Sequence, residues 1–511
     1  MSTPWVIQDA DLNELNRLAS FLALILKPGD AVALNGNLGA GKTTLARAVI
    51  IAMIGDTREE IPSPTFALMQ SYEDGRLPVA HIDCYRMAGA DELHEIGLED
   101  ALNHGAALIE WAERVMSALP DDRLDISLKD GAREDCRTIT IDGHGAWHER
   151  AQRLKAVMAF CAGSHWAHAR PEFLQGDASS RTYARLYMNG DSAILMDSPA
   201  RSDGEAIRGG KPYSALVHLA EDVKPFVAVA NALEGAGVCV PRILDHDLSQ
   251  GFLIIDDLGN RVFSSEAGED PSLETLYAAA VDVLVTLRQT PPADELPLPG
   301  GGTHAVPELG TDVLEIEAEL LLDWYYPCIH GRACPDSVRA NFLDTLRQLF
   351  PLVAGRDDAW VLRDFHSPNL LWVPEREGRA RVGVIDFQDA LKGHAAYDLV
   401  SLLQDARRDI SADLEGGLYA HYCEARGQRD SGFERDAFGA AYAVLGAQRN
   451  SKILGIFARL AKRDGKHGYL AHIPRVSAYL ERNLAHNGLK SLRAWFDEHL
   501  PQDVRAKALD I

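Results

Sequence analysis

Two stretches of the chain combine residue types that handle phosphate groups. The first, GNLGAGKTT, runs from Gly36 to Thr44 and fits the pattern G-x-x-x-x-G-K-[ST] in full. The second, VLRDFHSPNLLWV, runs from Val361 to Val373 and places an aspartate and an asparagine five residues apart. Each stretch needs a further acid to complete a metal site. The sequence therefore predicts two separate phosphate-handling sites in one chain.

The first stretch is predicted to bind a nucleotide. Its glycines let backbone N–H groups approach the phosphates, Lys42 adds a charge to the β- and γ-phosphates, and the Thr43 hydroxyl is a Mg²⁺ ligand. The residues expected to contact the nucleotide here are Asn37, Gly39, Ala40, Gly41, Lys42, Thr43 and Thr44. Two acids, Asp83 and Glu110, each end a predicted buried strand. Asp83 is the better candidate for the metal and Glu110 for orienting the attacking water, although the residues alone leave this open.

The second stretch has the spacing of a kinase catalytic loop. Asp364 is expected to accept the proton of an attacking hydroxyl, and Asn369 to ligate Mg²⁺. Asp386 follows a predicted strand and is the expected second Mg²⁺ ligand, through which the metal reaches the nucleotide phosphates. His366 and Asp398 are weaker candidates: an ordinary loop histidine and a helix cap explain them as well.

The flanking patterns predict the elements that position these residues. A short buried strand precedes the first stretch and a helix follows it, and the later strands end in Asp83 and Glu110. We expect an α/β P-loop domain over residues 1–145 and a helical linker over 146–170. An α+β kinase-like domain over 171–511 follows, with an N-lobe of about 171–262 and a mostly helical C-lobe of about 263–511.

Charge and composition limit the function classes. The net charge is −24; residues 1–158 hold 15 basic and 25 acidic residues, and the rest hold 36 and 50. Because tight binding to a nucleic acid backbone needs a basic face, a role in RNA metabolism would depend on partner proteins. The seven scattered cysteines favour reduced thiols, and no signal peptide or 18-residue apolar run is found. We expect a cytoplasmic protein.

Residues 9 to about 145 resemble the TsaE family, the small ATPases of bacterial tRNA threonylcarbamoyladenosine synthesis. The blocks that carry the resemblance are GNLGAGKTT, SPTFALMQSY (63–72), HIDCYR (81–86), ELHEIGLED (92–100) and LIEWAER (108–114). It implies a switch loop at Thr65 that senses the γ-phosphate, a metal role for Asp83, a hydrolytic role for Glu110 and a nucleotide contact at Trp111. It also implies ATP, Mg²⁺ and partners of the TsaB and TsaD type that hold the tRNA. The rival, a P-loop regulator without a tRNA link, is disfavoured by the SPTF and LIEW blocks.

Residues 170 to about 480 resemble the aminoglycoside phosphotransferase superfamily, and within it the AmgK-type kinases of N-acetylmuramate and N-acetylglucosamine. The blocks are GDASSRTYARL (176–186), ILMDSP (194–199), VPRILDHD (240–247), GFLIIDDLG (251–259), RDFHSPNLLW (363–372), IDFQDALKGHAAYDLVSLLQDAR (385–407) and QRNSKILGIFARL (448–460). The resemblance implies Asp364 as the base and Asn369 and Asp386 as Mg²⁺ ligands. It also implies a loop over the ATP phosphates that includes Ser179 and Arg181.

The second half departs from the superfamily pattern in two places. The histidine that usually stands two residues before the catalytic aspartate is Leu362, and the strand expected to carry a phosphate-binding lysine reads ILMDSP. Arg181 or Lys211 could replace that lysine, although a solvated surface base explains either. Three functions stay open for this half: a kinase acting on the anomeric hydroxyl of an amino sugar in cell-wall recycling, an aminoglycoside drug kinase, and an inactive kinase-like binding module. The intact set of Asp364, Asn369 and Asp386 argues against the third.

Overall fold

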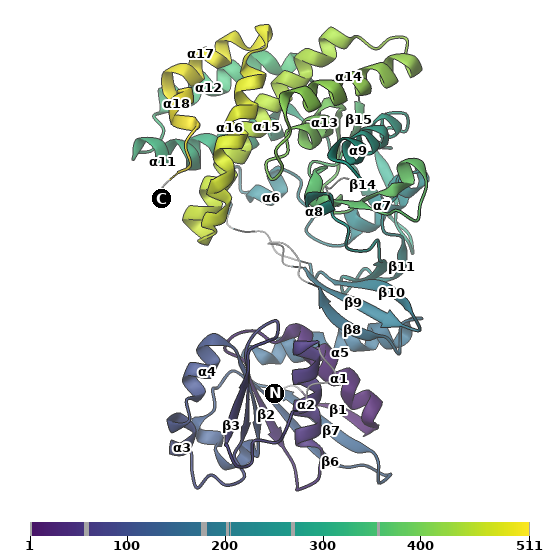
Figure 1. Cartoon of the computed structure of the whole chain (residues 1–511), viewed down its shortest axis with the longest axis vertical. Helices are drawn as coiled ribbons and strands as arrows, with labels where there is room; N and C mark the ends of the chain where they lie inside the picture. Colours follow the sequence, from purple (N-terminus) through teal and green to yellow (C-terminus); the bar gives the residue numbers. More distant parts are fainter. Residues whose placement is uncertain are drawn as a thin grey trace. The chain divides into compact units, whose positions relative to one another are not determined.

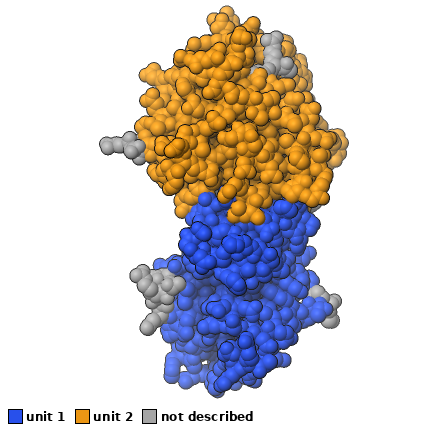
Figure 2. All heavy atoms as spheres, turned by 90° about the vertical axis from the view of Figure 1, so that its right-hand side faces the viewer, with its two compact units in different colours: residues 1–198, 245–257 blue, residues 199–244, 258–511 orange. Residues whose placement is uncertain are grey.

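The structure is a computed structural model that describes residues 3–55, 61–174, 181–200, 204, 206–266, 271–354 and 358–509. The chain forms two compact units, coloured separately in Figure 2. The first comprises residues 1–198 and 245–257, and the second comprises residues 199–244 and 258–511. Among the described residues, no helix has the length and apolar character needed to cross a membrane.

The first unit is built on a seven-stranded sheet of order β1-β7-β6-β2-β5-β4-β3. Its strands are β1 (Trp5–Ala10), β2 (Ala31–Asn35), β3 (Met69–Tyr72), β4 (Val79–Asp83), β5 (Ala106–Glu110), β6 (Arg123–Asp130) and β7 (Arg137–Gly143). The three central strands β2, β5 and β4 run parallel, and β6 continues them beside β2. β1, β3 and β7 pair antiparallel to their neighbours, so both edges of the sheet are antiparallel.

Helices cover both faces of this sheet (Figure 1). One face packs on α1 (Leu12–Ile25), α2 (Lys42–Ile54) and α5 (Trp147–Gly163), and the other on α3 (Asp91–Glu95) and α4 (Leu98–His104). The central strands are apolar on both sides, as strands of a covered parallel sheet must be. Successive side chains alternate between the faces, so that His81, Asp83 and Glu110 all lie on the α2 side.

A second, five-stranded sheet of order β11-β12-β10-β9-β8 shares the core of the first unit. Its strands are β8 (Arg170–Leu174), β9 (Thr182–Met188), β10 (Asp191–Asp197), β11 (Ile243–Asp247) and β12 (Phe252–Asp256). Phe160 of α5 stacks on Phe252 with ring centroids 5.5 Å apart, and Arg153 Nε of α5 donates to Asp197 Oδ1 at 3.0 Å. The expected linker helix is therefore packed on both sides, between the P-loop fold and this sheet.

The second unit is mostly helical. Its helices are α6 (Tyr213–Leu216), α7 (Lys224–Gly235), α8 (Phe263–Glu266), α9 (Leu273–Leu287), α10 (Thr311–Leu320), α11 (Tyr326–His330), α12 (Asp336–Leu349), α13 (Ala396–Leu403), α14 (Ala412–Arg429), α15 (Arg435–Asp464), α16 (Ile473–Leu484), α17 (Lys490–His499) and α18 (Gln502–Arg505). Three short strand pairs complete it: β13 (Glu295–Pro297) with β14 (Thr303–Ala305), β15 (Asp358–Val361) with β18 (Leu391–His394), and β16 (Leu370–Trp372) with β17 (Val382–Val384).

The predicted fold class is confirmed: a P-loop α/β fold is followed by a kinase-like fold with a helical C-terminal region. The boundaries proposed at 145 and 170 stay a prediction, since compact packing units and evolutionary domains need not coincide. In the structure the sheet β8–β12 belongs, by packing, to the first unit.

Candidate active sites

The nucleotide-binding loop joins β2 to the N-terminus of α2, as predicted. Its glycines are required: Gly41 has φ +104°, and a Cβ at Gly36 would lie 2.4 Å from the Leu128 carbonyl oxygen. α2 begins at Lys42, so Thr43 and Thr44 lie in its first turn, while Asn37, Gly39 and Ala40 lie in the loop. A loop of this form directs backbone N–H groups and the positive helix end toward one point, where an anion binds.

The Lys42 ammonium group is buried and fully engaged with protein groups. Its Nζ donates to the carbonyl oxygens of Gly36 at 2.7 Å and Asn37 at 3.0 Å. It also lies 3.5 Å from the ring centroid of Trp111, a cation–π contact. Burial lowers the pKa of Lys42, and the negative charge of Glu110 opposes that shift. Trp111, the expected nucleotide contact, thus lies directly beside the phosphate-binding lysine, with a positive φ of 58°.

Asp83 and Glu110 are brought together because β4 and β5 are parallel neighbours, with these two residues in register at their carboxyl ends. They have different partners. Thr43 Oγ1 donates to Glu110 Oε2 at 2.8 Å, whereas Thr65 Oγ1 donates to Asp83 Oδ2 at 2.9 Å. Ser63 Oγ also reaches Asp83, at 3.2 Å. Glu110 therefore faces the expected metal-binding hydroxyl, and Asp83 holds the loop that contains Thr65.

The residues of this site fit a Mg²⁺–nucleotide complex. The hydroxyl of Thr43 and the carboxylate of Glu110 are hard oxygen donors of the kind that Mg²⁺ prefers, and they are already in contact. A hydroxyl that donates its hydrogen to a carboxylate keeps its oxygen lone pairs for a metal. The Thr43 hydroxyl is thus oriented for the ligand role expected from the sequence.

The kinase-type site lies on the loop between β15 and β16, in the second unit. Asn369 Nδ2 donates to the Asp364 carbonyl oxygen at 3.0 Å and lies 3.4 Å from Asp386 Oδ2. This leaves the Asn369 amide oxygen available to a metal beside Asp386. Gln388 Nε2 donates to the other carboxylate oxygen of Asp386 at 2.9 Å. The three residues singled out by the sequence are therefore neighbours, and their oxygen donors fit Mg²⁺.

The Asp364 carboxyl is about half exposed and lies near three basic side chains. Desolvation raises the pKa of Asp364, but interactions with His366, Lys452 and Arg449 outweigh it and hold the pKa below its ordinary value. His366 Nε2 lies 3.8 Å from Asp364 Oδ1. Burial lowers the pKa of His366 itself, so this imidazole carries a positive charge only at acidic pH.

Two buried carboxylates hold the catalytic loop, and sequence reasoning missed both roles. The sequence left Asp398 open between a site residue and a cap of its own helix; the structure shows no such cap, and Asp398 instead accepts from the backbone N–H groups of Leu362 at 2.6 Å and Arg363 at 3.0 Å. Burial raises the pKa of Asp398 to about 7, against the effect of these two hydrogen bonds. Glu317 of α10 accepts from the guanidinium of Arg363 and, at 2.7 Å, from Lys452 Nζ.

The contacts of Asp398 and Glu317 hold a backbone segment that has an unfavourable conformation. Arg363, immediately before Asp364, has φ +68°, and Asp386 has φ +61°. Residues other than glycine rarely adopt this conformation, and it persists where surrounding contacts enforce it, often at functional sites. The carboxylate of Asp398 holds the Arg363 backbone, and Glu317 holds its side chain. Because these partners lie 35 and 46 residues away in sequence, no local pattern could have indicated them.

The phosphate-binding cation of the kinase-like half stays unassigned. Ser179 lies outside the described residues, together with most of the expected loop 176–181. Arg181 is described and Lys211 is exposed. Asp197, in the strand that lacks the usual lysine, pairs with Arg153 of α5.

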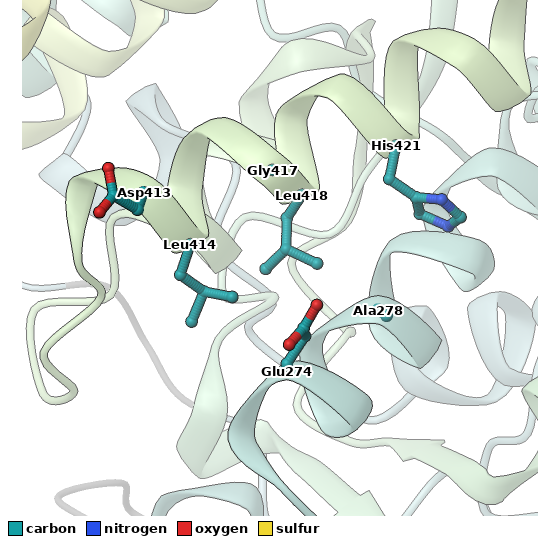
Figure 3. A pocket seen from close by; sticks show the side chains of 7 residues that line it. All are labelled: Glu274, Ala278, Asp413, Leu414, Gly417, Leu418 and His421. Atoms are coloured by element: carbon teal, nitrogen blue, oxygen red, sulfur yellow. The ribbon is translucent and has the colours of Figure 1, made fainter.

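A separate groove of about 470 Å³ lies between α9 and α14 in the second unit (Figure 3). It is lined by Glu274, Ala278, Asp413, Leu414, Gly417, Leu418 and His421. Beside it, the His421 imidazole pairs with Asp282 at 2.9 Å. No residue predicted from the sequence to be functional lines this groove.

Comparison with known proteins covers both parts of the chain. The family described as threonylcarbamoyl adenosine biosynthesis protein TsaE matches residues 10–139, and the phosphotransferase enzyme family matches residues 171–437. A Caulobacter vibrioides N-acetylmuramate/N-acetylglucosamine kinase is 37% identical over 372 residues, which cover 70% of this chain and 99% of that protein. The TsaE protein of Rickettsia conorii is 40% identical over 129 residues, covering 25% of this chain and 73% of the relative. That of Bacillus subtilis is 40% identical over 137 residues, covering 27% and 84%. The chain therefore belongs to two families at once, the TsaE family through residues 10–139 and the phosphotransferase enzyme family through residues 171–437.

Proposed function

We propose that the chain is a bifunctional enzyme. Its N-terminal part is an ATPase that supports formation of N6-threonylcarbamoyladenosine at position 37 of tRNA. Its C-terminal part is a kinase that transfers phosphate from ATP to the anomeric hydroxyl of N-acetylmuramate or N-acetylglucosamine. The observation that carries the proposal is that each part brings together the side chains expected to bind Mg²⁺: Thr43 contacts Glu110 in the first, and Asn369 contacts Asp386 in the second.

In the ATPase, the contacts indicate different roles for the two acids, Glu110 and Asp83. Glu110 holds Thr43 and so belongs with the metal, where Mg²⁺ would neutralise charge on the β- and γ-phosphates. Asp83 holds Thr65, so the state of the Thr65 loop is coupled to the site through this carboxylate. This differs in emphasis from the sequence expectation, which favoured Asp83 for the metal and Glu110 for the attacking water; both acids stay within reach of either role. Lys42 must leave its two carbonyl partners to bind the phosphates.

In the kinase, Asp364 accepts the proton of the sugar hydroxyl, and Asn369 and Asp386 hold Mg²⁺ on the ATP phosphates. A base with a lowered pKa stays ionised at neutral pH, although its basicity is smaller. Orientation of the hydroxyl and neutralisation of charge by the metal then contribute most of the rate. The strained loop that Asp398 and Glu317 hold is what fixes that orientation.

The comparison with known proteins favours a sugar over a drug as the acceptor. The Caulobacter vibrioides relative, 99% of whose length is covered by the match, is named as a kinase of N-acetylmuramate and N-acetylglucosamine.

The ATPase part is proposed to act with proteins of the TsaB and TsaD type, which would hold the tRNA. The acidic balance of residues 1–158 supports this division, because a net negative charge opposes binding to the tRNA backbone. The cytoplasmic location expected from the sequence stays a prediction.

The kinase assignment is tested by incubating the purified full-length chain with ATP, Mg²⁺ and, separately, N-acetylmuramate, N-acetylglucosamine and an aminoglycoside. The expected product is a sugar 1-phosphate, identified by coupling between phosphorus and the anomeric proton in NMR. Phosphorylation of the aminoglycoside with both sugars untouched would reject the sugar kinase. The ATPase assignment is tested by adding TsaB- and TsaD-type proteins with tRNA and measuring the modified adenosine.

A further inference from the structure

A histidine that the sequence did not single out is part of the ATPase site. His81 lies on β4, two residues before Asp83, and its side chain is fully buried. Its Nε2 is 2.8 Å from Glu110 Oε1. The other oxygen of the same carboxylate, Oε2, accepts from Thr43 Oγ1 at 2.8 Å. Glu110 is therefore held between His81 on one side and Thr43 on the other.

The chemistry of the groups fixes which atom donates. An ionised carboxylate only accepts hydrogen bonds, so the imidazole carries its hydrogen on Nε2 when it bonds Glu110. The second ring nitrogen, Nδ1, is buried without a hydrogen-bond partner among the residues the structure describes. A second hydrogen on Nδ1 would have no acceptor there. The ring is thus set to donate one hydrogen bond, and that bond goes to Glu110.

A purely structural role explains this arrangement poorly. Val79, the preceding residue of β4 on the same face of the sheet, is a buried apolar residue, and an apolar side chain would also fill the position of His81. A buried imidazole nitrogen without a partner carries a desolvation cost that such a residue avoids. Among the residues that the structure describes, the side-chain hydrogen bond of His81 that offsets this cost is the one to Glu110.

We propose that His81 is a positioning residue of the ATPase, which fixes the Glu110 carboxylate so that its second oxygen orients the Thr43 hydroxyl toward Mg²⁺. The proposal rests on the proposed ATPase function. Without the donor on Oε1, the carboxylate can rotate about its terminal bonds, and Thr43 loses a fixed acceptor. Metal binding should suffer first, because Thr43 and Glu110 lie at the expected metal position.

The test uses His81→Leu, His81→Gln and His81→Asn in the full-length chain. Leucine donates nothing. Glutamine places an amide N–H near the position of Nε2, and asparagine places one near Nδ1, where the described structure offers no acceptor. ATP hydrolysis is measured without sugar, as a function of Mg²⁺ concentration. Sugar phosphorylation by the same preparation reports whether the rest of the chain is intact.

We expect His81→Leu and His81→Asn to raise the Mg²⁺ concentration for half-maximal hydrolysis at least fivefold and to lower kcat at least tenfold. His81→Gln should stay within about threefold of wild type in both, and all three should phosphorylate the sugar normally. If His81→Leu fails to fold, the comparison of His81→Gln with His81→Asn decides. Equal activity of these two, or wild-type Mg²⁺ dependence in His81→Leu, would overturn the proposal. If wild type and Lys42→Ala hydrolyse ATP equally, the ATPase function itself has failed, independently of His81.

Discussion

The buried ion cluster beneath the kinase loop gives a stability prediction with an internal control. Glu317 is fully buried and compensates two cations, Arg363 and Lys452. Desolvation raises the pKa of Glu317, but these two charges reverse the shift and keep the pKa below its ordinary value. Replacing Glu317 with Gln leaves both cations without a counter-charge in the interior. Breaking a buried ion pair in this way typically costs about 3–5 kcal/mol.

The control lies two residues away on the same helix. Glu315 pairs with Arg347 at 2.7 Å, but that guanidinium is about half exposed, so water and salt replace the interaction at little cost. For a unit of this size, 1 kcal/mol corresponds to roughly 2 °C in Tm, so we expect Glu317→Gln to lower the Tm by about 6–10 °C. The Tm of Glu315→Gln should change by less than about 2 °C.

Differential scanning calorimetry of the full-length variants measures both shifts. Residual sugar phosphorylation after heating identifies the transition that belongs to the kinase fold. Because Glu317 holds Arg363 next to Asp364, the surviving Glu317→Gln enzyme should also have a lower kcat well below its Tm. Equal and small shifts for the two variants would refute the claim that the buried cluster supports the catalytic loop.

Three further predictions follow from other contacts. Asp364→Asn keeps the shape of the loop but removes the proton acceptor, so kcat for sugar phosphorylation should fall by about 10²–10⁴-fold with little change in the KM for ATP; a loss below tenfold would contradict its role as base. Burial raises the pKa of Asp398 to about 7, so the folded chain keeps its proton between about pH 4 and 7 while the unfolded chain has released it. As pH rises through that range, the unfolding free energy of wild type should therefore fall relative to that of Asp398→Asn, by at most about 1.4 kcal/mol per pH unit, as measured by denaturant titration. If the two unfolding free energies change with pH in the same way, Asp398 does not hold a proton in the folded chain. Thr65→Val removes the hydroxyl that binds Asp83, so partner-dependent tRNA modification should fall at least tenfold while sugar phosphorylation is unchanged; unaltered modification would separate the Thr65 loop from the ATPase cycle.

The amino-acid sequence predicted those site residues that belong to one continuous motif or that end neighbouring strands. The loop from Gly36 to Thr44 forms as expected because its motif contains both its turn chemistry and its ligands. Asp83 and Glu110 meet because the carboxyl ends of parallel strands lie at one edge of a sheet. Which of the two faces Thr43 depends on strand order: β5 is the direct neighbour of β2, whereas β4 is one strand further away. The sequence does not state that order.

The residues that hold the sites in place were harder to predict. Asp398 and Glu317 reach the catalytic loop from α13 and α10, and their roles depend on how helices pack rather than on any local pattern. His81 left a weak signal, since residues 81 and 83 of one strand lie on the same face. The packing of the sheet β8–β12 with the P-loop fold also had no local signature, because α5 presents an ordinary helical pattern.

The central claim, that one chain carries two separate phosphate-transfer sites, is tested most directly by measuring both activities in Lys42→Ala and Asp364→Asn. Lys42→Ala should abolish support of tRNA modification in the presence of the partner proteins and retain wild-type sugar phosphorylation. Asp364→Asn should retain tRNA modification and lose sugar phosphorylation. Loss of both activities in either variant, with the protein still folded, would contradict the account.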